Sequence, residues 1–133
     1  MSIEGVQAHD VDSVWEKVAP LVERAMEYAD GKMNAEDVYT QLKSKELQLW
    51  LVPGGIWVTR IVVYPRSTRM EWIVAAGEYQ EWAAHFPLLF DWAKVHGCDA
   101  VEMGGRKGWG RKVRMDDDSY EFEEIHRVYR VRL

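Results

Sequence analysis

The chain has 133 residues, of which 47% are hydrophobic and 29% charged, and its formal net charge is −5. This composition excludes intrinsic disorder, and the length predicts one domain, residues 1–133, built around one core. The acidic average argues against nucleic-acid binding, which needs clustered positive charge. Because Cys98 is the only cysteine, an intramolecular disulfide and a metal site made of several thiolates are both excluded.

The sequence contains no pattern for export or membrane insertion. The first ten residues lack the basic and apolar regions of a signal peptide, and no run approaches the roughly twenty apolar residues that span a bilayer. The four histidines are scattered without neighbours at a metal-binding spacing. We therefore expect a cytoplasmic protein with neither a membrane partner nor a bound metal.

Two helices are predicted in the first third of the chain. Apolar residues recur every three or four positions from Val11 to Tyr28, which is typical of an amphipathic helix, and Gly31 is placed to end it. Asn34, with Asp37 three residues later, approaches the spacing of a capping box, in which two side chains satisfy free backbone N–H groups. A short second helix is therefore expected to begin there and to continue to about Leu47.

The middle of the chain has the composition of β-strands. The runs from Leu47 to Val52 and from Ile56 to Tyr64 are rich in β-branched and aromatic residues, and Pro53-Gly54-Gly55 between them predicts a hairpin turn. A second polar turn, from Pro65 to Arg69, precedes another apolar run from Met70 to Ala76. These three runs predict an antiparallel meander.

The last third of the chain returns to a helix and then to strands. Apolar spacing predicts a helix from about Tyr79 to His96 that Gly97 caps. The short apolar run from Ala100 to Met103 follows that helix, so it is expected to pair in parallel at the centre of the sheet. The alternating segment from Ile125 to Leu133 predicts a final strand. The fold class is therefore α+β, a mixed sheet with helices on both faces.

This order of elements resembles the GNAT acyltransferase fold, most closely from Leu47 to the C-terminus. The resemblance lies in the hairpin, in Met-Glu-Trp-Ile-Val-Ala-Ala at 70–76, and in Gly-Cys-Asp-Ala-Val-Glu at 97–102. It implies a GNAT-like mixed sheet in which an antiparallel meander is followed by a helix crossover to a parallel central strand. It also implies an N-acetyltransferase activity with acetyl-CoA as the cofactor.

The cofactor loop is the place where the sequence departs from this family. Active GNAT proteins hold the pyrophosphate of acetyl-CoA in a Gln/Arg-x-x-Gly-x-Gly/Ala loop, because glycines let backbone N–H groups converge on the phosphates. The resemblance places the cofactor-binding residues here at Gly77, Glu78, Tyr79, Gln80 and Glu81. This stretch has one glycine and two carboxylates, which repel phosphate at the start of a helix. The departure weighs against acetyl-CoA binding in the usual manner.

Glu71 is the first catalytic candidate that the resemblance implies. It lies on the strand where several GNAT proteins carry a general base, and burial beside Ile73 and Trp57 would favour that role. The alternative is an exposed strand carboxylate that forms an ion pair with Arg60 or Arg69.

Tyr120 is the second catalytic candidate. Ser119-Tyr120-Glu121-Phe122 resembles the turn that leads to the last GNAT strand, near the place from which a family tyrosine protonates the departing thiolate. Because an aromatic residue in this turn also fits a packing role in the core, that alternative stays open.

The densest basic segment supplies candidate partner-binding residues. Gly105-Arg106-Lys107-Gly108-Trp109 resembles a segment of small GNAT-like proteins encoded by bacteriophages. Its chemistry suits a phosphate or an acidic protein partner. The acidic residues that follow, between 116 and 124, favour the alternative of an internally balanced, solvated face. The candidate residues are Arg106, Lys107, Trp109, Arg111 and Lys112.

Two functions follow from these patterns. The leading hypothesis is a non-catalytic protein-binding or assembly module, of phage origin and without a cofactor, in which some of the seven tryptophans are exposed to a partner. The alternative is an acyl-CoA-dependent N-acetyltransferase, with acetyl-CoA as cofactor. A phage protein would reside in the host cytoplasm or the virion. Free strand edges near Leu47 to Val52 or Ile125 to Leu133 would allow a homo-oligomer.

Overall fold

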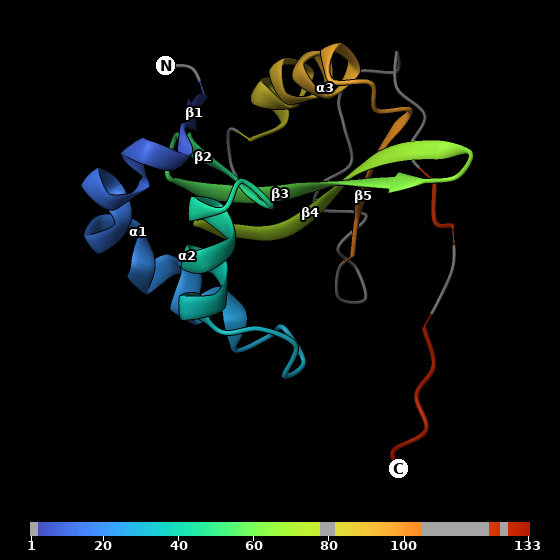
Figure 1. Cartoon of the computed structure of the whole chain (residues 1–133), viewed down its shortest axis with the longest axis horizontal. Helices are drawn as coiled ribbons and strands as arrows, with labels where there is room; N and C mark the ends of the chain where they lie inside the picture. Colours follow the sequence, from blue (N-terminus) through green and yellow to red (C-terminus); the bar gives the residue numbers. More distant parts are fainter. Residues whose placement is uncertain (1–2, 78–81, 105–122, 126–127) are drawn as a thin grey trace.

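The computed structural model describes residues 3–77, 82–104, 123–125 and 128–133. Figure 1 shows a curved sheet with helices on both of its sides. In chain order the elements are β1 (Glu4–Val6), η1 (Ala8–Asp10), α1 (Val11–Met26), α2 (Ala35–Lys43), β2 (Gln48–Val52), β3 (Gly55–Tyr64), β4 (Ser67–Gly77), η2 (Trp82–His85), α3 (Phe86–Val95) and β5 (Ala100–Met103).

The five strands form one mixed sheet in the order β1-β2-β3-β4-β5. The first four strands pair antiparallel, whereas β4 and β5 run parallel, as expected for a strand that follows a crossover helix. The α+β prediction with helices on both faces is therefore confirmed. No helix in the described part of the chain is long and apolar enough to cross a membrane.

Several local predictions are confirmed by the geometry. Asn34 and Asp37 form the complete capping box of α2, because each side chain accepts a hydrogen bond from the backbone N–H of the other residue. The hairpin of β2 and β3 turns at Pro53 and Gly54, and Gly54 has a φ of 80°. Gly97, just past α3, has a φ of 82°, a left-handed value that glycine adopts without steric cost.

The core consists of two clusters, one on each face of the sheet. Helices α1 and α2 cover one face, and their side chains pack with Leu49, Ile56 and Val58 of the sheet. Helix α3 covers the other face, where it packs against three buried tryptophans: Trp50, Trp57 and Trp72. We call these the α1/α2 face and the α3 face.

The tryptophans are explained largely by this packing. Besides the three buried indoles, Trp15 and Trp92 are half-buried, so none of the five tryptophans whose side chains the structure describes is exposed. The expectation that tryptophans are kept on the surface for a partner is therefore wrong for these five residues.

The N-terminal half differs from the prediction in two respects. Strand β1 was not predicted, and it pairs with β2, so the edge of Leu47 to Val52 is covered rather than free. Helix α2 ends at Lys43 instead of continuing to Leu47, because Lys45 adopts a left-handed φ of 70° that a helix does not accommodate.

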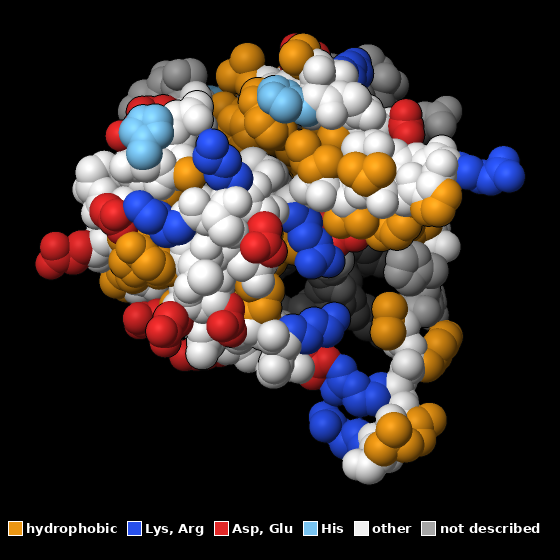
Figure 2. All heavy atoms as spheres, viewed as in Figure 1, with side chains coloured by type: hydrophobic (Ala, Val, Ile, Leu, Met, Phe, Trp, Pro, Cys, Tyr) orange, Lys and Arg blue, Asp and Glu red, His pale blue; other side chains and the backbone are white. Residues whose placement is uncertain are grey.

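The C-terminal half differs in three respects. The α-helix begins at Phe86 rather than Tyr79, because Pro87 lacks an N–H and is favoured in a first helical turn. Among the described strands, β5 is last in the sheet order and not central. The described residues of the predicted strand from Ile125 to Leu133 form no strand, because they have no strand partner, and Arg130 instead pairs with Asp30 beyond α1. Figure 2 shows apolar and basic side chains along this segment, which stands away from the body.

Candidate functional site

A β-bulge in β4 organises the candidate site. Val58 of β3 is opposite Val74, but the next residue, Thr59, is opposite Trp72, so Ile73 is an extra residue in β4. An extra residue turns two consecutive side chains to the same face of a sheet. Ile73 and Val74 accordingly both pack in the cluster on the α1/α2 face, whereas Trp72 packs on the α3 face.

Strands β4 and β5 separate at this bulge. Their parallel pairing ends at Trp72 and Met103, whereas β4 continues to Gly77. Within the described residues, β4 from Ile73 to Gly77 therefore pairs with β3 on one side and with no strand on the other. On that side the N–H and C=O groups of β4 have no strand partner among the described residues, and an extended ligand can occupy such an edge in the manner of an added strand. We call this edge the β4 opening.

Glu71 lies two residues before the bulge, on the α1/α2 face. Its carboxylate accepts hydrogen bonds from Arg60, through Nε at 2.8 Å and in an ion pair with Nη2 at 2.6 Å, and from the Tyr64 hydroxyl at 3.2 Å. The Glu71 side chain is 23% exposed. The structure thus shows an ion pair with Arg60 and not Arg69, on a carboxylate that is half-buried rather than exposed. Trp57 lies on the opposite face of the sheet.

A second carboxylate, Glu102 of β5, lies next to Glu71. The two are register partners in the parallel pair, so their side chains leave the sheet on the same face. Glu102 accepts a hydrogen bond from Arg69 Nη1 at 3.1 Å and is also 23% exposed. Glu102 was not among the predicted site residues. The available signal was a single charged residue within the apolar strand from Ala100 to Met103.

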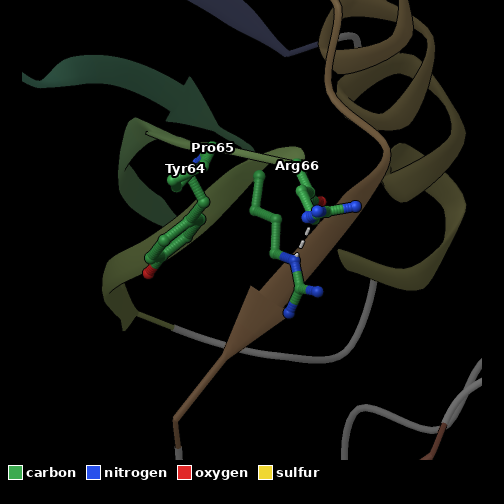
Figure 3. Close-up of a pocket in the computed structure, with 5 residues that line it drawn as sticks. Tyr64, Pro65 and Arg66 are labelled. Atoms are coloured by element: carbon green, nitrogen blue, oxygen red, sulfur yellow. Dashed lines mark hydrogen bonds between the residues drawn. The ribbon is translucent and has the colours of Figure 1, made fainter.

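A hollow adjoins these carboxylates at the turn between β3 and β4. It has a volume of about 460 Å³ and is lined by Tyr64, Pro65, Arg66, Ser67 and Arg69. Figure 3 shows that Tyr64 and Arg66 point away from each other. Because Tyr64 binds Glu71 and Arg69 binds Glu102, the lining of the hollow is continuous with the carboxylate pair.

Gly77 ends β4 and is the one predicted cofactor-binding residue that the structure describes. Its φ of 119° lies in the region that only glycine readily adopts. A Cβ at this position would lie 2.1 Å from the carbonyl oxygen of Gly54 in the hairpin turn. The packing of the sheet therefore requires glycine at position 77, independently of any role in cofactor binding.

The other predicted site residues lie outside the described residues. These are Glu78, Tyr79, Gln80 and Glu81 of the cofactor loop, Tyr120, and the basic segment with Arg106, Lys107, Trp109, Arg111 and Lys112. Their roles stay predictions.

Cys98, which follows α3, is half-buried and lies near Asp99. Burial raises the pKa of the Cys98 thiol, and the nearby Asp99 carboxylate raises it further. A thiol with a raised pKa is a weak nucleophile at neutral pH. In the part of the chain that the structure describes, no group of three or more metal-ligating side chains comes together.

No protein-family profile matches this chain, and no curated protein is similar to it in sequence.

Solved structures, in contrast, are similar over nearly the whole chain. A probable acetyltransferase has a TM-score of 0.62 at 13% identity, with 97% of this chain and 100% of that chain covered. An aminoglycoside acetyltransferase from an uncultured soil metagenomic sample, in complex with sisomicin, has a TM-score of 0.61 at 13% identity, with 98% and 96% covered. The ribosomal-protein-alanine N-acetyltransferase of Brucella melitensis biovar Abortus 2308 has a TM-score of 0.57 at 13% identity, with 96% and 99% covered.

These likenesses confirm the GNAT-like fold that the element order predicts. At 13% identity they show the fold and no more. They give no support to a phage origin.

Proposed function

We propose that this chain is an acyl-CoA-dependent N-acyltransferase whose reaction takes place at the β4 opening. The observation that carries the proposal is the separation of β4 from β5 at the bulge, directly beside the carboxylates of Glu71 and Glu102. The similar structures that are described as acetyltransferases support it. The alternative hypothesis from the sequence is thereby favoured over the leading one.

The described residues fit the pantetheine arm of an acyl-CoA. That arm is extended and carries two amide groups, which suit the free N–H and C=O groups along β4 from Ile73 to Gly77. Bound acyl-CoA would supply an acyl group activated as a thioester. The hollow at the β3–β4 turn, whose lining residues Tyr64 and Arg69 bind the two carboxylates, is left for the acceptor amine.

Side chains of the protein then carry out the proton transfers of the reaction. We assign Glu71 as the general base, which takes a proton from the acceptor amine as the nitrogen–carbon bond forms and the carbon–sulfur bond breaks. The hydrogen bonds from Arg60 and Tyr64 hold this carboxylate in place. Tyr120 is the proposed donor of a proton to the departing thiolate, on the strength of the GNAT resemblance alone.

A non-catalytic protein-binding module is the second candidate function. It is favoured by Glu78 and Glu81, two carboxylates where a diphosphate would have to lie. The tryptophan argument for this candidate is weakened, because the five tryptophans with described side chains pack within the fold.

Calorimetric titration with acetyl-CoA separates the two functions. The enzyme predicts saturable binding at micromolar concentration, followed by release of free coenzyme A when a panel of primary amines is added. Titration with adenosine 3′,5′-bisphosphate, which lacks the pantetheine arm, serves as the control and should bind at least tenfold more weakly. Absence of heat at millimolar acetyl-CoA would reject the enzyme and favour the binding module.

A further inference from the structure

Trp72 carries a buried hydrogen-bond donor that has no partner among the described residues. Its side chain is 8% exposed, and its indole Nε1 has no hydrogen-bond partner within the described structure. Most buried polar groups in proteins are hydrogen-bonded, because desolvation of an unsatisfied donor costs free energy. Trp50, in the same cluster, follows this rule, since its Nε1 donates to Thr59 Oγ1 at 3.0 Å.

The Trp72 ring is held in one orientation by its neighbours. It makes edge-to-face contacts with Trp57, at 4.7 Å between ring centroids, and with Phe86 of α3, at 5.3 Å. Trp57 and Phe86 are themselves in contact, at 5.5 Å, so the three rings form a closed aromatic set. The indole N–H is therefore fixed in direction, which is the condition for a binding group that is organised before its ligand arrives.

The position of Trp72 in the sheet places it at the β4 opening. It is the last residue of β4 that pairs with β5, opposite Met103, and the bulge follows at Ile73. A ligand that runs along the free edge of β4 from Gly77 to Ile73 ends at this residue.

We propose that the Trp72 indole N–H donates a hydrogen bond to a carbonyl oxygen of the bound acyl-CoA and so fixes its position in the β4 opening. This inference rests on the proposed function and adds a positioning residue that neither the GNAT resemblance nor the comparisons assign. The carbonyl belongs either to the thioester or to a pantetheine amide. Both are neutral carbonyl acceptors, and the test below tells them apart.

The test compares two tryptophan variants that lose an N–H. Trp72→Phe removes the proposed ligand donor, and Trp50→Phe removes a donor whose partner is within the protein. We expect Trp72→Phe to raise the Kd of acetyl-CoA by about fivefold to tenfold, as befits the loss of one neutral hydrogen bond. Trp50→Phe should leave that Kd unchanged and lower the urea midpoint. Replacement of Trp72 by 3-benzothienylalanine, which keeps the ring shape without the N–H, provides the same comparison if the smaller phenyl ring unfolds the protein.

Titrations with coenzyme A identify which carbonyl accepts the hydrogen bond from Trp72. If the indole N–H binds a pantetheine amide, Trp72→Phe raises the Kd of coenzyme A and the Kd of acetyl-CoA by the same factor. If it binds the thioester carbonyl, Trp72→Phe raises only the Kd of acetyl-CoA, and kcat also falls. In ¹H–¹⁵N spectra, acetyl-CoA should move the indole signal of Trp72 and not that of Trp50. If the wild type binds and both Trp72 variants bind equally well, the inference is wrong while the proposed function stands. If the wild type does not bind acetyl-CoA, both are rejected.

Discussion

Gly55 and Gly77 face each other across the end of the β3–β4 ladder with no room for a side chain at either position. A Cβ on Gly55 would lie 2.0 Å from the carbonyl oxygen of Ala76, and one on Gly77 would lie 2.1 Å from that of Gly54. Backbone therefore packs directly on backbone where β4 leaves the sheet toward the predicted cofactor loop.

Gly77→Ala should destabilise the protein by about 3 kcal/mol, because it combines a left-handed φ with a backbone clash. Gly31→Ala is the matched control, since Gly31 also has a positive φ, of 73°, but nothing lies within 4 Å of the position that a Cβ would occupy there. Gly31→Ala should lower the free energy of unfolding by about 1 kcal/mol, from backbone strain alone. Urea unfolding of both variants measures the difference, and equal losses would show that the contact with the hairpin turn contributes nothing.

Thr59 links the buried indole of Trp50 to the sheet. Its hydroxyl accepts from Trp50 Nε1 and donates to Gln48 Oε1 at 2.9 Å, and it is fully buried. Thr59→Val keeps the shape and leaves the indole N–H without its acceptor, so the free energy of unfolding should fall by about 1–3 kcal/mol. Thr40→Val, at an exposed position of α2, should change it by no more than about 0.5 kcal/mol. A loss at position 59 no larger than at position 40 would contradict this role.

The fold was predictable wherever local chemistry decides the structure. The capping box of α2 and the Pro-Gly-Gly turn satisfy backbone groups within a few residues, so their patterns are visible in the sequence. In contrast, strand β1 and the edge position of β5 are determined by pairing between strands that are distant in the sequence. Three residues such as Glu4 to Val6 carry no such information, because their pairing with β2 spans more than forty residues.

The candidate site was predictable in part for the same reason. Glu71 was identified through the resemblance of its strand, but its partner Arg60 is set by the register of β3 and β4. The bulge at Ile73 breaks the period of two, so the opening that it creates cannot be read from alternation. Glu102 becomes a neighbour of Glu71 only through the parallel register of β4 and β5.

Asp12, Tyr39 and Lys43 connect α1 to α2 and should make stability depend on pH at both extremes. Hydrogen bonds from Lys43, at 2.7 Å, and from the Tyr39 hydroxyl lower the pKa of Asp12, and the same bonds raise the pKa of Tyr39 and of Lys43. A lowered carboxyl pKa stabilises the fold above its unfolded value of about 4, and this contribution is lost as the pH falls through the lower folded value. The raised pKa values of Tyr39 and Lys43 stabilise below about 10, and this contribution is lost as the pH rises through them.

Asp12→Asn should therefore lower the urea midpoint most between about pH 5 and pH 9, and the difference from wild type should shrink toward pH 2.5 and pH 11. Asp91→Asn, at an exposed position on α3, serves as the control and should show no such window. Because all three groups are at the surface, the effect should also decrease in 1 M salt. A difference that stays constant with pH would mean that the contact between α1 and α2 is not electrostatic.

Glu71 and Glu102 are adjacent carboxylates with separate arginine partners, and the proposed mechanism uses only one of them as base. Glu71→Gln keeps the size of the side chain and removes the proton acceptor, so kcat should fall by about 100-fold or more while the Kd of acetyl-CoA is unchanged. Glu102→Gln should have a smaller effect, and Glu4→Gln, on β1 three strands away from β4 in the sheet order, should have none. If Glu102→Gln lost the activity and Glu71→Gln kept it, the base would be the carboxylate of β5, and the acceptor amine would approach from the outer edge of the sheet.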